Sequence, residues 1–256
     1  MTKWGRPYAL RTAELLPVLL VSLRRRARGH QLVVGRGLPG ALALVEQWPM
    51  GVRERERKVY GPLWRAGLEV IPNAVPDGTM PFVLGYGTED VTGGFSHRYD
   101  TPRLVDRLNA DWYDLAASSG LLDHRREFLV QLPQGTRTHR AALRNLHGGS
   151  HTAPAVWTRV RLLERWDIMG RGAASAFLGV HAGHPGFAMM ALDTSVYVHA
   201  STGETGVDVL AVRHPDRSAN ILRHLEWITL HDSPYVHREF KQRIAAWLAN
   251  RRRSAA

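Results

Sequence analysis

Several features that mark common protein classes are missing from this sequence. None of the 256 residues is cysteine, which excludes disulfides, thiolate zinc sites, iron–sulfur clusters and cysteine nucleophiles. The G-x-S-x-G turn of a nucleophile elbow is also absent, so nothing indicates a standard serine hydrolase. The apolar run from Leu15 to Val21 is too short to span a bilayer and is interrupted by Pro17.

Lysine is scarce. The chain has 34 basic and 23 acidic residues, for a net charge of +11, and only Lys3, Lys58 and Lys241 are lysines. Arginine binds carboxylates and phosphates in a bidentate manner. The charge predicts affinity for polyanions: an anionic small molecule, an acidic partner or, weakly, nucleic acid. The same arginine excess also arises in GC-rich genomes without any functional meaning.

The order of charge and apolarity near the start does not match a secretion signal. The basic cluster Arg24 to Arg28 follows the apolar run, whereas a signal peptide carries its positive charge before it. We therefore expect residues 12–28 to form an amphipathic helix and the protein to be cytoplasmic, without membrane association.

Residues 31–72 have the pattern of a βαβ unit. Short strands at 31–35 and 68–72 flank a helix that ends near residue 67, which predicts a parallel strand pair. Gly35 to Gly40 has the G-x-G-x-x-G spacing of a dinucleotide-binding turn. Pro39 within it, and the absence of an acidic residue after the second strand, favour a simple tight turn instead.

Two segments resemble each other. Residues 70–85 match 179–193 in their turn residues and their methionine-containing apolar strand, and each is followed by further strand and by a helix, 104–115 or 221–230. The pattern predicts an α/β fold with two similar, pseudo-duplicated halves, 1–120 and 121–256. These would form one compact pseudo-two-fold unit of mixed sheets flanked by helices.

The remaining segments give simpler predictions. Residues 121–150 have a mainly helical pattern, 157–163 alternate like a half-buried strand, and 236–253 form a final amphipathic helix. Trp112 and Trp227 lie at helical spacing with leucines, so we expect both in the core. The last helix could pack within the chain or at a homodimer interface.

This two-copy pattern, with an Arg/His-x-Asp turn and a closing helix in each half, resembles the phospholipase-D-like fold. It is most similar to the catalytically degenerate versions that serve as sensor domains of bacterial transcription regulators. Residues 181–199 are also similar to the effector domain of actinobacterial helix-turn-helix regulators. The active family's H-x-K-x-x-x-x-D motif is absent, so the resemblance implies no phosphohistidine chemistry. It implies no direct DNA binding either, since no helix-turn-helix is visible.

Histidines are the strongest candidates for chemistry. His181 and His184 flank a turn and His199 ends the next strand, so the three could meet at one sheet edge as catalytic acid–base groups. A metal site is the weaker alternative, because few carboxylates lie at ligand spacing, and we assign none. Solvated loop histidines are the third interpretation. His147 and His151 flank a glycine-rich segment that resembles a loop over an active site.

Two Arg–Asp turns could form an anion site. Arg98 with Asp100, and Arg213 with Asp216, would face each other across the axis of a true duplication. Two arginines in a shared cleft suit a phosphate or carboxylate ligand. The alternative is a local salt bridge closing each turn.

Together these features favour a non-catalytic regulatory or ligand-binding protein that holds an anionic small molecule or partner in a cleft between its halves. One alternative is an enzyme of specialised metabolism that acts on a phosphorylated or peptide substrate with histidine acid–base and arginine anion-binding residues. The other is a basic nucleic-acid-binding protein. The sequence identifies no cofactor.

Overall fold

The fold is taken from a computed structural model of the chain, which describes residues 54–71, 74–81, 83, 86–133, 155–231 and 238–255. The chain divides into two units, Met1–Trp48 and Pro49–Ala256, and all described residues belong to the second. The predictions for residues 12–28, 31–35, 35–40 and 147–151 lie outside the described residues.

A seven-stranded sheet organises this unit. Its strand order is β1-β4-β3-β7-β8-β9-β2, and every pair of neighbours is antiparallel. The strands are β1 (Leu68–Val70), β2 (Val91–Arg98), β3 (Glu127–Pro133), β4 (Ala155–Leu162), β7 (Phe187–Met190), β8 (Val196–Thr202) and β9 (Gly206–Arg213). A separate hairpin pairs β5 (Gly179–His181) with β6 (His184–Pro185).

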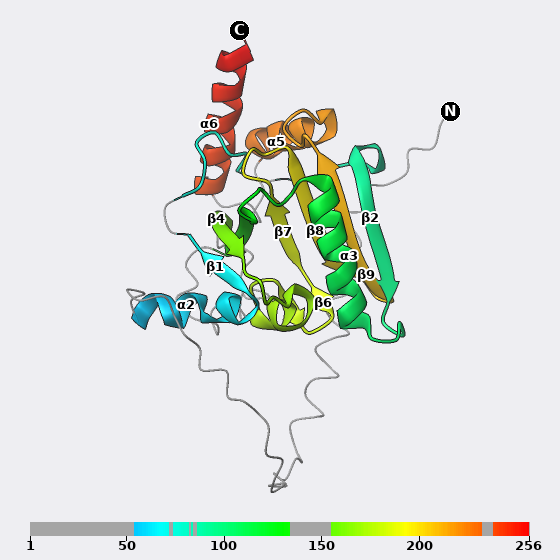
Figure 1. The fold of residues 1–256 in the computed structure, drawn as a ribbon. Helices are drawn as coiled ribbons and strands as arrows, with labels where there is room; N and C mark the ends of the chain where they lie inside the picture. The colour runs from blue at the N-terminus through cyan, green and yellow to red at the C-terminus, as the bar shows by residue number, and fades with distance from the viewer. Residues whose placement is uncertain are drawn as a thin grey trace, which may run out of the picture. The chain divides into compact units, whose positions relative to one another are not determined.

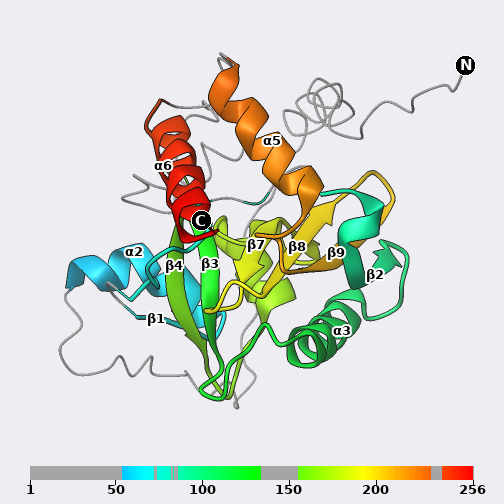
Figure 2. The ribbon, with the colours of Figure 1, turned by 90° about the horizontal axis from the view of Figure 1, so that it is seen from above.

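Helices cover both faces of the sheet. They are α2 (Glu54–Arg65), α3 (Leu104–Ser119), α5 (Ala219–Leu230) and α6 (Arg238–Ala255), with short turns η2 (Thr88–Asp90), η3 (Ile168–Gly172) and η4 (Ala173–Ser175). α3 lies across β8 and β9 (Figure 1). From above, α3 is on one side of the sheet and α5 and α6 are on the other (Figure 2). No helix among the described residues is both long and apolar enough to cross a membrane.

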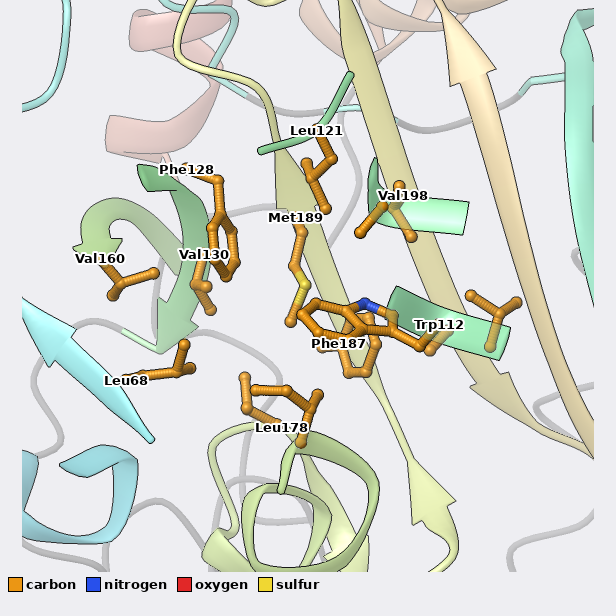
Figure 3. Close-up of a cluster of buried hydrophobic side chains, with 14 of the residues drawn as sticks. Leu68, Trp112, Leu121, Phe128, Val130, Val160, Leu178, Phe187, Met189 and Val198 are labelled. Carbon is orange, nitrogen blue, oxygen red and sulfur yellow. The ribbon is translucent and has the colours of Figure 1, made fainter. Parts of the chain in front are cut away.

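The two-residue period of the strands produces two hydrophobic cores. On β8, Val198 points to the core beneath α3, whereas the neighbouring Tyr197 points to the core beneath α5 and α6. Met189 and Met190 on β7 divide in the same way. In the first core, Trp112 of α3 packs beside Phe187 and Phe128 (Figure 3). All four residues of β7 are buried, as expected of the strand in the middle of the order.

A polar network ties η3 to α3. The Asp167 carboxylate accepts hydrogen bonds from the backbone N–H groups of Gly170 and Arg171 at the start of η3. It also accepts one from the Asn109 amide at 2.8 Å, and the Asn109 side-chain oxygen accepts one from Met169 N–H. η3 in turn contacts the β5–β6 hairpin, because the Gly183 N–H donates a hydrogen bond of 2.8 Å to the Met169 carbonyl.

Most of the predicted elements are confirmed. The helices predicted at 104–115, 221–230 and 236–253 correspond to α3, α5 and α6, and the strand predicted at 157–163 corresponds to β4. The mainly helical prediction for 121–150 is wrong over Glu127–Pro133, which form β3. The prediction of an α/β fold with helices flanking a sheet is confirmed, although the described sheet is antiparallel throughout rather than mixed.

The finer prediction of two duplicated halves is not confirmed. Each predicted copy does contain a strand followed by a helix, β2–α3 and β9–α5. However, α3 and α5 cover opposite faces of the sheet. The sheet also takes β1 and β2 from residues 1–120 and the remaining strands from 121–256, so the described parts of both segments contribute to one sheet.

A buried carboxylate joins three strands at the β1 end of the sheet. Glu127 is 1% exposed and is the only charged residue that is buried in the described part of the chain. Its Oε2 accepts hydrogen bonds from Nε and Nη2 of Arg159 (2.8 and 2.5 Å), and its Oε1 accepts from Nε and Nη2 of Arg161 (3.1 and 2.6 Å). Arg161 also reaches Glu69 on β1 at 3.1 Å. Burial acts to raise the pKa of Glu127, but the two guanidinium groups outweigh it and hold that pKa below its usual value.

Replacing Glu127 by Gln should lower the free energy of unfolding by about 3 kcal/mol, because two guanidinium groups lose their shared anion in a buried site. Glu69→Gln is the matched control. Glu69 is more exposed and contacts one arginine, so the expected loss is below about 1 kcal/mol. Urea unfolding of both variants measures the difference, and equal losses would contradict a special role for Glu127.

The wild type and Glu127→Gln also test how the free energy of unfolding depends on pH. The stabilisation by Glu127 is complete above the unfolded-state pKa of 4.5 and is lost as the pH falls through the lower folded-state pKa. The wild type should therefore lose more stability than Glu127→Gln between pH 6 and pH 3. Parallel curves for the two proteins would contradict this assignment.

Candidate functional site

Two of the three predicted catalytic histidines meet at the β5–β6 hairpin. His181 and His184 are partners across the hairpin, and their ring centroids are 3.7 Å apart. Tyr99, just after β2, stacks on His184 with centroids 4.6 Å apart and planes at 14°. The rings form a small aromatic cluster in which His181 is exposed and Tyr99 and His184 are partly buried. Burial lowers the pKa of His184, and the neighbouring His181 adds to this effect.

His199 does not join this pair. It lies on β8 between Val198 and Ala200, which point to the core beneath α3, so its own side chain is on the opposite sheet face. There its Nδ1 is 2.8 Å from the hydroxyl of Tyr86. Burial lowers the pKa of His199 and raises those of Tyr86 and Tyr197. His199 is therefore a neutral imidazole in a largely enclosed Tyr–His pair.

The predicted anion site is not assembled. Arg98 lies at the end of β2 opposite Gly206, the first residue of β9, whereas Arg213 is the last residue of β9. The antiparallel register therefore separates the two arginines by about 23 Å, a full strand length. Arg98 and Asp100 form a local pair at 3.3 Å with both side chains 74% exposed, as in the salt-bridge alternative. In the described part of the chain, Arg213 and Asp216 form no ion pair.

A different surface emerges on the outer face of α5. We define the α5 surface as Arg223, His224, Trp227, Leu230 and His231. Trp227 is 49% exposed and Leu230 is 80% exposed. His224 and His231 stack on opposite sides of Trp227, with ring centroids 5.9 and 4.8 Å from it. The three rings form a row along the helix, which contradicts the prediction that Trp227 belongs to the core; Trp112, with 0% exposure, does belong there.

An open hollow of about 370 Å³ adjoins this row. The described residues that line it are Asn220, Arg223, His224 and Trp227. Arg223 forms no hydrogen bond or ion pair with any described residue, and its side chain is exposed. Asn220 is held by Glu89 and Asp90 through its side-chain amide. Burial lowers the pKa of His224, which keeps the imidazole beside Trp227 neutral at pH 7.

The chain matches no protein-family model, no curated protein and no solved structure. Among the described residues, no group of three or more histidines, aspartates or glutamates is arranged to hold a metal ion. The hollow beside α5 combines the Arg223 guanidinium with an exposed aromatic ring, and these two groups together can hold a planar anion.

The sequence contained a signal for the α5 surface. Ile221, Leu225 and Ile228 recur at intervals of four and three residues and mark the buried stripe of the helix. At 100° per residue, Trp227 lies about 120° from Ile221 around the helix axis. The spacing of Trp227 from Ile221, Leu225 and Ile228 therefore identifies it as exposed. Its spacing from leucines alone does not.

The Tyr86–His199 pair gives a pH prediction. The unfolded chain restores the histidine pKa to about its ordinary value of 6.5, so below pH 6.5 the unfolded state binds more protons and stability falls. One such group contributes a slope of at most about 1.4 kcal/mol per pH unit. His199→Gln should reduce the loss of unfolding free energy between pH 7.5 and 5.5.

His124→Gln is the control, since the His124 side chain is 81% exposed and makes only a long, solvent-screened contact of 4.0 Å with Asp123. Its replacement should change the slope less than His199→Gln does. His184 and His224 also have lowered pKa values, so some slope should remain in His199→Gln. An identical pH profile for wild type and His199→Gln, measured by urea unfolding, would contradict a lowered pKa of His199.

Proposed function

We propose that this chain is a non-catalytic binding protein for an anionic small molecule that carries a flat ring, and that the ligand binds on the α5 surface. The observation that carries the proposal is the half-exposed indole of Trp227 beside the guanidinium of Arg223, which has no hydrogen-bond or ion-pair partner among the described residues. Stacking on an indole holds a planar ring, and a free guanidinium holds a carboxylate or phosphate.

The packing of α5 supports a rigid platform. Ile221, Leu225 and Ile228 are buried against the sheet, so the helix that carries the exposed ring is fixed from behind. The two flanking imidazoles hold the indole plane along the helix. A platform that is already ordered loses little entropy when a ligand stacks on it, which favours binding.

The lining of the hollow favours binding over catalysis. His224 is the only one of the four described lining residues that could transfer a proton near neutral pH, and no carboxylate pairs with it in the described part of the chain. The enzyme alternative depended on a meeting of His181, His184 and His199, and the third of these lies on the other sheet face. We therefore place the enzyme alternative second.

The nucleic-acid alternative uses the same chemistry. A base could stack on Trp227 while a phosphate contacts Arg223, and the net charge of +11 would add nonspecific attraction. The proposed relationship to degenerate phospholipase-D-like sensor domains rests on the two-copy pattern, mainly over residues 176–235, and stays a prediction, as does the internal duplication. Both would be in keeping with a regulatory binding role.

The first test is thermal unfolding of the full chain with nucleotides, aromatic carboxylates and a short single-stranded oligonucleotide at low and moderate salt. The proposal predicts a small aromatic anion that raises the midpoint with dose and keeps its effect as salt increases. Shifts that occur only with the oligonucleotide and vanish with salt would contradict it and favour the nucleic-acid alternative.

Variants then locate the site. Trp227→Ala should weaken binding of the best compound in that panel by at least about tenfold, because stacking on an aromatic side chain contributes about 1–3 kcal/mol. Arg223→Gln should weaken it by a similar factor. Arg107→Gln, which removes an exposed charge from α3, is the control and should bind normally. Isothermal titration measures the affinities; unchanged binding by both α5 variants would contradict the proposal.

A further inference from the structure

The outer edge of β2 is the longer of the two edges of the sheet in the described part of the chain. β2 is the last strand in the order and has eight residues, whereas β1 at the other end has three. Proteins usually protect such an edge with proline, lysine, a bulge or a covering element. β2 contains neither proline nor lysine, and its one register shift lies at its start, between Val91 and Gly93. Figure 1 shows α3 over β8 and β9, set back from this edge.

The register with β9 identifies the backbone groups that face outward from β2. The Tyr99 N–H donates to the Thr205 carbonyl at 3.1 Å, and the pairing with β9 is regular from Gly94 to Arg98. In an antiparallel strand, the N–H and C=O of one residue point to the same side, and this side alternates along the chain. The N–H and C=O groups of Gly94 and Ser96 therefore point away from β9, where a further strand could pair with them.

The charges at the two ends of β2 favour a second copy of this chain as that strand, in antiparallel orientation. Glu89 and Asp90 directly precede β2, and Arg98 is its last residue. An antiparallel copy brings the acidic end of each β2 beside the basic end of the other, whereas a parallel copy would place like charges together. The present contact of Arg98 with Asp100 is solvent-screened, since both side chains are 74% exposed.

Phe95 indicates the register of this pairing. Its ring is partly buried and lies 5.7 Å from that of His97 at the margin of the first core. A two-fold axis at Phe95 places Gly94 opposite Ser96 of the second copy, so that the outward N–H and C=O groups of both residues are paired. The two Phe95 side chains then lie opposite each other at a non-hydrogen-bonded position, where side chains are closest and aromatic pairs are favourable.

We propose that two copies of this chain associate through their β2 strands, antiparallel and centred on Phe95, so that their two sheets become one continuous sheet. A two-fold axis perpendicular to the sheet keeps both α3 helices on the same face. Because α3 is set back over β8 and β9, it leaves room for the spacing of about 4.8 Å between paired strands.

Sedimentation velocity of the full chain over a wide range of protein concentrations tests the association, and we expect a monomer–dimer equilibrium. Ser96→Pro removes an outward N–H without removing a bond to β9, and proline is tolerated in edge strands at such positions. This variant should weaken the dimer by at least about tenfold, because the two-fold axis makes each lost hydrogen bond count twice. Ser96→Ala keeps the N–H and is the matched control, which should associate like the wild type.

A disulfide tests the register. The chain contains no cysteine, so a single introduced cysteine can form a disulfide only between chains. Phe95→Cys should give a linked dimer under mild oxidation, because opposite non-hydrogen-bonded positions have Cα atoms about 4.5 Å apart, within the range that a disulfide spans. His124→Cys, exposed in the turn between α3 and β3, is the control and should remain unlinked.

Three results would overturn the proposal. They are a wild type that stays monomeric at every concentration, a dimer of equal strength in wild type and Ser96→Pro, and no more linked dimer from Phe95→Cys than from His124→Cys. Circular dichroism checks that every variant is folded. The association is measured without ligand and does not involve the α5 surface, so either proposal can fail without the other.

Discussion

Burial of both faces of one antiparallel sheet is the constraint on which the rest of this structure depends. Each internal strand places alternate side chains in two separate cores, and helices must cover both. α3 and η3 cover one face, while α5 and α6 cover the other (Figure 2). α5 and α6 bury their apolar stripes against the second core, and the outer face of α5 is left exposed.

The arginine excess divides between structural and available groups. Arg159 and Arg161 neutralise the buried Glu127 at the β1 end of the sheet, and Arg98 closes a local turn with Asp100. These residues need no ligand to explain them. Arg223 is different, since it lies beside an exposed tryptophan and pairs with none of the residues that the structure describes. Net charge alone could not distinguish these cases, because the partner of each guanidinium depends on the register of strands distant in sequence.

Helices and strands with one polar face were predictable from the sequence, whereas strands that are buried on both faces were not. The apolar stripes of α3, α5 and α6 and the alternation of β4 each leave one face polar, which reveals the period. β3 was predicted as helix because Phe128, Leu129 and Val130 are buried on both sides of the sheet. A continuous apolar run of this length does not distinguish a central strand from a buried helix.

The candidate sites show the same limit. The contact between His181 and His184 follows from a short turn and was within reach of sequence analysis. The position of the His199 side chain depends on which sheet face each residue of β8 occupies. The sequence does not settle this, because Tyr197 and Val198 are both apolar enough to lie on either face. The distance between Arg98 and Arg213 depends on the antiparallel pairing of β2 with β9, which the sequence does not specify.

The most direct measurement of the central claim, that α5 presents the ligand-binding surface, is hydrogen–deuterium exchange of the full chain with and without the aromatic anion that gives the largest thermal shift. The account predicts slower exchange in peptides covering residues 219–231, with the amides of β8 and α3 unchanged. Protection confined to the sheet or to the hairpin, with exchange over 219–231 unaltered, would contradict it.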